Sequence, residues 1–264
     1  MTEIVDAGFR LARPRGQRVD CTLTKLPQHF PSRPNRSDGL RNEARCTLNP
    51  VEERQRGAAE APNLGEPAVP RPAASVVLLR RGGRHGDRAL EVLLLKRTES
   101  ARFMPGVWVF PGGALDAHEG DDETGYRACA ERELAEEAGI ELSDPGALVL
   151  FSRWITPEIV SRRFDAWFFL ALAPAHSPPR PDGVETTEAR WFEPRAALEA
   201  AAAGELTLAF PTIKQLESLL PFHTSEEAIE AHRGRVVEPM LPKVIGTHEK
   251  HRVVLPGDPD YPAD

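Results

Sequence analysis

The apolar residues of this chain gather in short runs that begin at about residue 74. Residues 74–79 and 90–95 are runs of strand length, rich in β-branched and aliphatic side chains, and a Gly-rich connection joins them. This pattern predicts a β-hairpin. Short apolar pairs at 244–245 and 253–254 predict two closing strands near the end of the chain. Four further runs predict strands, at residues 107–110, 147–151, 164–172 and 189–192, of which 147–151 and 164–172 are expected to be buried.

Residues that commonly begin or end helices lie between and after these runs. A helix is predicted from about Tyr126 to Gly139, because a glycine can end a helix in the left-handed conformation. Proline in a first turn, glycine after a last turn and Thr-Glu capping pairs are comparable signals. Three more helices are predicted in this way, one between Pro194 and Gly204, one around residues 213–220, and one from a capping box at Thr224 and Glu227 through about Arg233.

Strands interleaved with helices predict an α/β protein, in which an α/β/α sandwich encloses a mixed sheet and is followed by C-terminal helices. Residues 1–72 differ, since they are rich in Arg and Pro and show little apolar periodicity. Such a segment cannot bury enough surface to offset its chain entropy. We therefore expect a disordered extension over residues 1–72 and a folded domain over residues 73–264. A transit peptide, which the acidic residues of this segment argue against, and a true start of the protein further downstream are the alternative explanations for this extension.

Composition narrows the class of protein. The 264 residues are 41% hydrophobic and 28% charged, which suits one sizeable core with extensions. A net charge of −7 argues against nucleic acid as a partner, because a phosphate backbone needs a concentrated basic surface. No apolar run approaches the roughly 20 residues that cross a bilayer. We expect a protein of the cytoplasm that binds no membrane, and a homodimer is compatible with the sequence.

Cysteine usage points to the same compartment. The chain has an odd number of cysteines, and their spacing does not suit zinc. They are Cys21, Cys46 and Cys129. A disulfide framework is therefore not expected, which agrees with a reducing environment.

The candidate chemistry lies in a cluster of carboxylates on the first predicted helix. Glu133, Glu136 and Glu137 stand at positions i, i+3 and i+4, so their side chains project from one face. Like charges at this spacing destabilise a helix, whereas a hard divalent cation such as Mg²⁺ turns them into ligands. The plainer interpretation is a solvated helix face rich in Glu. The Phe-Pro-Gly-Gly segment at 110–113 favours the metal site, because we expect its glycines to turn the backbone sharply beside the helix, using positive φ.

These residues resemble the signature of the Nudix hydrolases, in which a Gly is followed by five residues, Glu, seven residues, and then Arg-Glu-aliphatic-x-Glu-Glu-x-Gly-aliphatic. Residues 132–140 fit the second half without error. Gly113 and Glu119 fit the first half, but twelve residues rather than seven separate Glu119 from Arg132. The chain therefore carries a five-residue insertion, and either Glu119 or Glu123 could occupy the family's first acidic position.

The resemblance implies a Nudix-type α/β/α sandwich and Mg²⁺ or Mn²⁺ as cofactor. It also implies Glu133 and Glu137 as direct metal ligands, Glu136 as a ligand or a carboxylate that positions water, and the Gly112 carbonyl as a further oxygen ligand. Arg132 would orient a carboxylate and would not donate a proton, given its high pKa.

A second resemblance lies just upstream, in residues 93–113. Arg97, Arg102, Gly106 and Phe110 fall in register with the motif of the coenzyme A diphosphatases within this family, although Thr98 stands where that motif has Ser or Ala. The resemblance implies that Arg97 and Arg102 bind phosphates of the substrate, for which the planar guanidinium group is suited.

The sequence therefore predicts a metal-dependent diphosphatase that cleaves coenzyme A or an acyl derivative to 3′,5′-ADP and (acyl)phosphopantetheine. The alternatives are a diphosphatase acting on ADP-ribose or a dinucleotide, and a Nudix module that binds a nucleotide without cleaving it. A general base from outside the signature is often needed in this family, and the sequence offers Glu158, Glu185 and Glu188 for it.

Overall fold

The computed structural model describes residue 63 and residues 65–82, 90–246 and 251–262. Most of the segment predicted to be disordered, together with Cys21 and Cys46, lies outside these ranges, as does most of the connection within the first hairpin. No helix among the described residues is long and apolar enough to cross a membrane.

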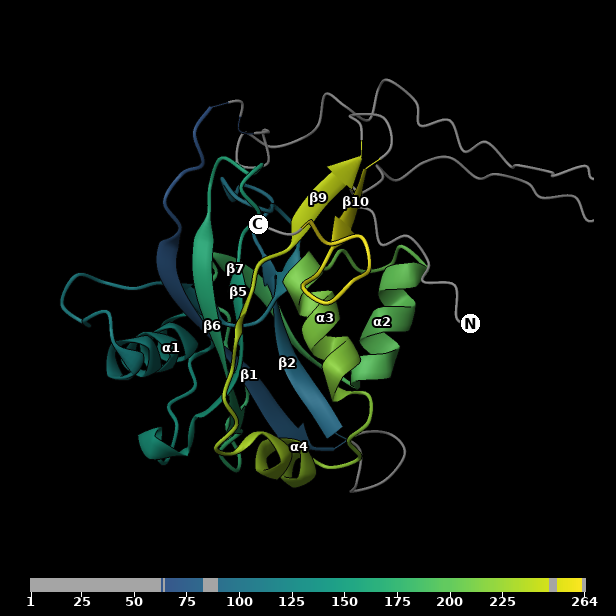
Figure 1. The fold of residues 1–264 in the computed structure, drawn as a ribbon. Coiled ribbons are helices and arrows are strands. Elements are labelled where there is room, and N and C mark those ends of the chain that lie inside the picture. The colour runs from purple at the N-terminus through teal and green to yellow at the C-terminus, as the bar shows by residue number, and fades with distance from the viewer. Residues whose placement is uncertain (1–62, 64, 83–89, 247–250, 263–264) are drawn as a thin grey trace, which may run out of the picture.

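Helices cover both faces of a central mixed sheet, as the sequence predicted (Figure 1). The strands are β1 (Arg71–Arg81), β2 (Leu90–Arg97), β3 (Trp108–Val109), β4 (Gly112–Ala114), β5 (Val149–Ile155), β6 (Phe164–Leu172), β7 (Thr186–Phe192), β8 (Pro239–Met240), β9 (Lys243–Gly246) and β10 (His251–Val254). The helices are α1 (Glu123–Ala138), the short 3₁₀ helix Pro145–Ala147, α2 (Pro194–Ala202), α3 (Phe210–Leu219) and α4 (Ser225–His232).

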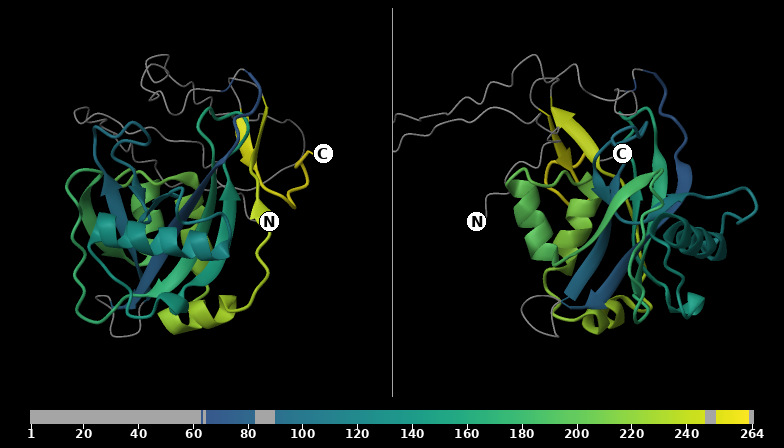
Figure 2. Two further views of the ribbon diagram at one scale, coloured as in Figure 1. Left: turned by 90° about the vertical axis from the view of Figure 1, so that its left-hand side faces the viewer. Right: turned by 180° about the vertical axis from the view of Figure 1, so that it is seen from behind.

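The side-chain alternation of β1 divides the core into two halves. Val76 and Leu78 point to one face of the sheet, where they pack with residues of α1. Val77 and Leu79 point to the other face, where they pack with residues of α2, α3 and α4. Successive strand side chains lie on opposite faces, so a continuous apolar run is the expected sequence of a strand covered on both sides. Figure 2 shows α1 lying across one face of the sheet and the later helices on the other.

The main sheet has the order β3-β2-β1-β6-β5-β8, with β4 also pairing with β1 and β7 with β2. The pairs β1–β6 and β5–β8 are parallel and the others are antiparallel, which makes the sheet mixed. The two closing strands were predicted correctly as strands. They are β9 and β10, which pair with each other in a separate two-stranded sheet.

Helix α1 begins earlier than the predicted start at about Tyr126. Its N-cap is Asp122, whose side chain accepts a hydrogen bond of 2.9 Å from the Gly125 amide. This bond satisfies one of the amides that a helix start leaves without a partner. The predicted end is confirmed, because Gly139 is left-handed with φ of 63° and its amide donates to the carbonyls of Ala135 and Leu134.

The three C-terminal helices lie where the sequence predicted them. Helix α2 begins at Pro194 and is followed by Gly204 with φ of 76°. The capping box of α4 is present in both directions, between the Thr224 hydroxyl and the Glu227 amide and between the Glu227 carboxylate and the Thr224 amide. Helix α3 starts at Phe210, ahead of the predicted residue 213, because a proline occupies its first turn.

Strands β1 and β2 pair with each other along only part of their length. They diverge toward the end of the sheet at which the candidate site lies. Near one end they pair directly, with Leu79 opposite Val92. Toward the other end β1 pairs with β4, and β2 pairs with β3. The segment that joins β3 to β4 therefore passes through the gap between the two strands. This connection places the Gly-Gly segment against helix α1.

Candidate active site

Gly112 and Gly113 belong to strand β4, which differs from the turn with positive φ that we predicted. They pair with Ser75 and Ala74 of β1, and neither has a positive φ. Their lack of a side chain is needed for a different reason. A Cβ at Gly112 would overlap Ser75, and a Cβ at Gly113 would overlap the carboxylate of Glu133. The glycines thus allow the backbone to approach both the neighbouring strand and the carboxylates of α1 closely.

Glu137 is the most deeply buried carboxylate of the helix cluster, at 4% exposure. Its Oε2 accepts a hydrogen bond of 2.9 Å from the Gly112 amide. The pKa of Glu137 is raised from 4.5 to about 8, mainly by burial and also by the nearby Glu133 and Glu185, while the Gly112 hydrogen bond and Arg97 act in the opposite direction. A carboxylate placed in this way favours a positive charge beside it.

Glu133 and Glu136 are joined by the guanidinium group of Arg132. Its Nη1 donates to Glu133 Oε1 at 2.7 Å and to Glu136 Oε2 at 3.0 Å. The Glu133 side chain is 14% exposed, and burial raises its pKa even though Arg132 acts in the opposite direction. The Glu136 side chain is 60% exposed and lies at the rim of the site. Glu133 and Glu137 therefore both lie beside the Gly-Gly segment, whereas Glu136 stands further out.

The other edge of the Arg132 guanidinium group binds Glu119. Arg132 Nε donates to Glu119 Oε1 at 2.9 Å and Nη2 donates to Oε2 at 3.2 Å. Burial alone would raise the pKa of Glu119, but the hydrogen bonds from Arg132 and from the Asp116 amide outweigh it, and the pKa is lowered. Glu123 instead pairs with Arg127 on the exposed side of α1. Of the two alternatives that the insertion left open, the structure brings Glu119 to the site.

The five-residue insertion leaves Glu119 in contact with Arg132. A Cβ at Gly125 would overlap the carbonyl oxygens of Glu119 and Gly120, so the inserted segment folds tightly against the first turn of α1. Gly120 itself has φ of 83°, a conformation that glycine adopts without strain. The extra residues form this turn and the early start of α1, and Glu119 remains within reach of Arg132.

Arg97 and Arg102 line one cavity of about 270 Å³, together with Thr98, Ser100, Ala101, Val184 and Glu185. Arg97 Nε donates to the Phe103 carbonyl at 3.0 Å, which holds the guanidinium group at the end of β2. Arg97 is also near enough to Glu137 to act against the rise of that carboxyl's pKa. The two arginines predicted to bind phosphate thus share a cavity beside the carboxylates of α1.

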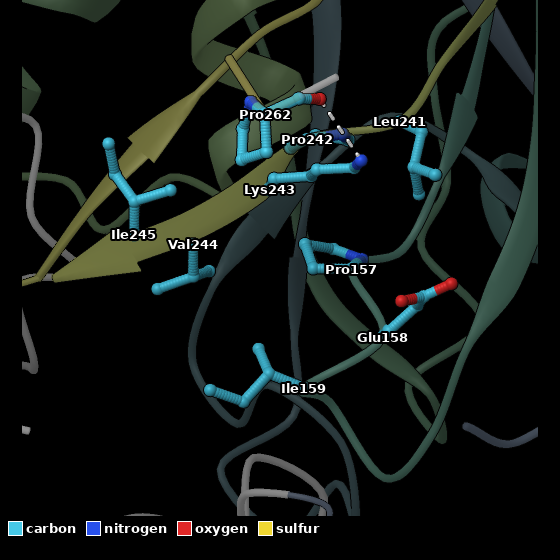
Figure 3. A pocket seen from close by; sticks show the side chains of 9 residues that line it. All are labelled: Pro157, Glu158, Ile159, Leu241, Pro242, Lys243, Val244, Ile245 and Pro262. Carbon is cyan, nitrogen blue, oxygen red and sulfur yellow. Dashed lines mark hydrogen bonds between the residues drawn. The ribbon is translucent and has the colours of Figure 1, made fainter. Parts of the chain in front are cut away.

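The three candidate bases lie in different places. Glu188 binds Lys96 and Arg190 on strand β7, and Glu158 lines a separate cavity near strand β9 (Figure 3). Glu185 lines the arginine cavity and raises the pKa of both Glu133 and Glu137. Of the three, the structure therefore brings only Glu185 to the carboxylate cluster.

Two residues that we did not single out in the sequence hold the loop that carries Glu185. Asp182 accepts hydrogen bonds from the amides of Val184, Glu185 and Thr186. The buried Thr186 hydroxyl donates to the Glu137 carbonyl at 3.1 Å, which ties the loop to α1. Asp182 followed by Gly183 is a turn signal in the sequence, but the contact of Thr186 with α1 depends on the tertiary structure.

The residues fit a hard divalent cation by their chemistry, although the side chains do not converge on one point. Among the described residues, no three acidic, His or Cys side chains are arranged as a ready metal cage. Arg132 holds Glu133 and Glu136, while Glu137 faces the Gly112 amide. The donors are carboxylate oxygens beside strand β4, and the pKa values of the buried Glu137 and the partly buried Glu133 are both raised. This donor set suits Mg²⁺ or Mn²⁺.

The burial of Glu137 predicts a pH dependence of stability in the presence of a chelator. Between about pH 4.5 and 8 the folded protein retains a proton that the unfolded chain has released, so the free energy of unfolding falls as the pH rises. Glu137→Gln removes this contribution. Thermal denaturation across this range should therefore show the Tm of the variant rising relative to that of the wild type. A relative fall toward high pH would mean that the fold stabilises the ionised carboxylate.

The fold and this site define a family. A model of the NUDIX domain matches residues 69–210, more than half of the chain, and the protein therefore belongs to the Nudix family. It is a hydrolase that acts on phosphorus anhydrides, and the enzymes of this family act on small nucleotide substrates and generally use divalent metal ions.

Individual relatives indicate the branch. The human acyl-coenzyme A diphosphatase NUDT19 is 26% identical, over 66% of this chain and 72% of its own length. The Xenopus laevis protein of the same name is 24% identical over the same shares. A NUDIX hydrolase from Alicyclobacillus acidocaldarius shares the fold with a TM-score of 0.57 and 26% identity, over 64% of this chain and 99% of that one. The resemblance to the coenzyme A diphosphatase-like branch is thereby confirmed.

Proposed function

We propose that this hydrolase cleaves the diphosphate of coenzyme A or an acyl-coenzyme A, giving 3′,5′-ADP and phosphopantetheine or its acyl derivative. The observation that carries the proposal is the shared cavity of Arg97 and Arg102 beside the carboxylates of α1. The names of the human and Xenopus laevis relatives, both acyl-coenzyme A diphosphatases, support it. The expected partner is thus a small nucleotide, and the net charge of −7 argues against nucleic acid.

In this proposal Arg97 and Arg102 bind the phosphate oxygens of the substrate through charge-assisted hydrogen bonds. Arg97 already donates through Nε to the Phe103 carbonyl, so its position is set before the substrate arrives. Arg132 is a positioning residue, because its contacts go to Glu119, Glu133 and Glu136. Its guanidinium group fixes Glu133 beside the Gly-Gly segment.

We assign Glu133, Glu136, Glu137 and the Gly112 carbonyl to a Mg²⁺ or Mn²⁺ site. When bound, such a cation polarises a phosphoryl oxygen and lowers the pKa of a water molecule. We assign the role of proton acceptor to the Glu185 carboxylate, which lines the arginine cavity and lies near Glu133 and Glu137. Thr186 and Asp182 would position this carboxylate by holding its loop on α1.

Product analysis tests the proposal directly. The protein is incubated with coenzyme A, ADP-ribose or NADH, each with Mg²⁺, with Mn²⁺ or with a chelator, and the products are identified by mass spectrometry. Phosphopantetheine and 3′,5′-ADP from coenzyme A, formed only with metal, are the expected result. Cleavage of ADP-ribose or NADH alone would retain the hydrolase and overturn the assignment of coenzyme A.

Arg102→Ala should weaken substrate binding without disturbing the fold, because Arg102 is exposed. Loss of one charge-assisted hydrogen bond costs about 1.5–3 kcal/mol, so we expect kcat/KM for coenzyme A to fall roughly tenfold or more, mainly through KM. Steady-state kinetics measures this. Arg190→Ala is the matched control, since this exposed arginine pairs with Glu188 on strand β7 and should leave KM unchanged. Equal KM values for both variants would remove Arg102 from the phosphate site.

A further inference from the structure

A second cavity, of about 230 Å³, lies between the loop after β5 and the chain around β9. Figure 3 shows its lining, which is mostly apolar. The loop after β5 supplies Pro157, Glu158 and Ile159, and the C-terminal segment supplies Leu241, Pro242, Lys243, Val244, Ile245 and Pro262. Seven of these nine residues are aliphatic or proline. These side chains offer apolar surface to a ligand, alongside polar surface in the same cavity.

The two charged residues leave the apolar lining intact. The Glu158 carboxylate points away from Val244 and Ile245 (Figure 3). Lys243 Nζ donates to the Pro262 carbonyl at 3.3 Å and lies 4.9 Å from the centre of the Tyr261 ring. Both charged groups are thus directed away from the wall that Val244 and Ile245 form. Ile159, at 46% exposure, is one of the few large apolar side chains that stand exposed among the described residues.

The loop that lines this cavity also contacts the loop that carries Arg102. The segment between β5 and β6 supplies Pro157 and Ile159 to the lining of the apolar cavity. Near its end, Arg162 contacts Phe103, as does Phe164 at the start of β6. The centres of the Phe103 and Phe164 rings are 5.7 Å apart, and Arg162 lies 6.0 Å above the Phe103 ring.

Phe103 in turn belongs to the loop that holds the two arginines, and its carbonyl accepts the hydrogen bond from Arg97. Strand register agrees with this proximity. Arg71 pairs with Phe164 at the end of β1 near the Gly-Gly segment, so the loop before Phe164 lies at the same end of the sheet as the carboxylates.

We propose that this apolar cavity binds the acyl chain of an acyl-coenzyme A while the diphosphate lies between Arg97, Arg102 and the carboxylates of α1. The inference rests on the proposed function and adds a binding site for the acyl chain. An acyl-coenzyme A carries its charge at one end and an apolar chain at the other. The structure offers an arginine-lined cavity and a cavity with apolar side chains, whose loops contact each other through Phe103. A nucleobase suits the apolar cavity less well, because no aromatic ring lines it.

The proposal predicts that activity depends on chain length. Each methylene that enters the cavity is worth about 0.8 kcal/mol, or roughly a fourfold gain in kcat/KM. We expect kcat/KM to rise from coenzyme A and acetyl-coenzyme A through butyryl- and hexanoyl- to octanoyl-coenzyme A, until the cavity is filled. Steady-state kinetics with this series, at fixed Mg²⁺, measures the gain.

Ile159→Asp tests whether the gain arises in this cavity. The side chain is half-exposed on a loop, so the variant should fold, which a thermal denaturation curve checks. We expect the octanoyl substrate to lose at least about tenfold in kcat/KM while free coenzyme A is cleaved as by the wild type. Val236→Asp is the matched control, since Val236 is 87% exposed and lines neither cavity, and it should preserve the chain-length profile.

The outcomes separate this inference from the proposed function. If coenzyme A is cleaved but the rate does not depend on chain length, the proposed function stands and the acyl cavity is wrong. An equal loss for coenzyme A and octanoyl-coenzyme A in Ile159→Asp would also overturn it, because the effect would then lie in the common part of the substrate. If no coenzyme A compound is cleaved, the proposed function fails and the acyl cavity fails with it.

Discussion

Glu137→Gln should reduce turnover of the substrate by roughly 1,000-fold while the fold remains intact. The estimate follows from variants in which one supporting group of a metal site or one electrostatic contact is lost, which commonly cost about 10-fold to 1,000-fold. Glutamine has nearly the same shape and keeps an oxygen that can accept the hydrogen bond from the Gly112 amide. The variant therefore removes a negative charge from the buried centre of the site and little else.

The measurement is kcat with saturating substrate and Mg²⁺, together with a metal titration. Glu123→Gln is the matched control, because Glu123 lies on the same helix, pairs with Arg127 on the exposed side and should show normal kcat. The kcat of Glu136→Gln should lie between the values for Glu137→Gln and Glu123→Gln, because the Glu136 side chain is 60% exposed. Normal turnover in Glu137→Gln would contradict the assignment of the metal site.

Arg132→Met should lower the free energy of unfolding by about 3 kcal/mol. The side chain of its partner Glu119 is 4% exposed, and removing one member of a buried ion pair leaves an uncompensated charge. The estimate is at the lower end of the range for buried pairs because the Asp116 amide still donates to Glu119 at 2.7 Å. Denaturation by urea, monitored by circular dichroism, measures the change.

Two further variants identify which contact of Arg132 accounts for the loss of stability. Adding Glu119→Gln to Arg132→Met removes the unpaired charge and should recover a large part of the loss. Arg233→Met breaks an exposed pair with Glu230 and should change stability by less than about 1 kcal/mol. If the double variant is no more stable than Arg132→Met, then the contacts of Arg132 with Glu133 and Glu136, and not its pair with Glu119, account for the loss.

Local signals in the sequence predicted much of the architecture. The strand run at residues 164–172 matches β6, and the helix ends at Gly139 and at the Thr224–Glu227 capping box are confirmed. Each of these features depends on residues within a few positions of one another. The hydrophobic runs at residues 74–79 and 90–95 were likewise predicted as strands of a hairpin, and the structure pairs β1 with β2 antiparallel. In the structure both faces of these strands are covered, which agrees with their continuous apolar sequence.

The features that sequence reasoning missed depend on contacts between distant segments. The Gly-Gly segment was predicted as a turn with positive φ, yet β1 supplies a partner strand and the glycines serve close approach instead. The choice between Glu119 and Glu123 depended on how the insertion folds against Gly125. The apolar cavity likewise brings together segments that are far apart in the chain, around Ile159 and Val244.

The parallel pairing of β1 with β6 has a consequence for biosynthesis. Ala74 pairs with Trp167, so about 90 residues must be made after the first strand before the sheet can close beside it. Contacts this distant in sequence form late, because the entropy of closing the intervening loop is lost before any pairing is gained. The loop that holds α1 through Thr186 is made later still. A chain still on the ribosome that has been extended only past Gly139 therefore carries the entire Nudix signature without the sheet that shapes its site.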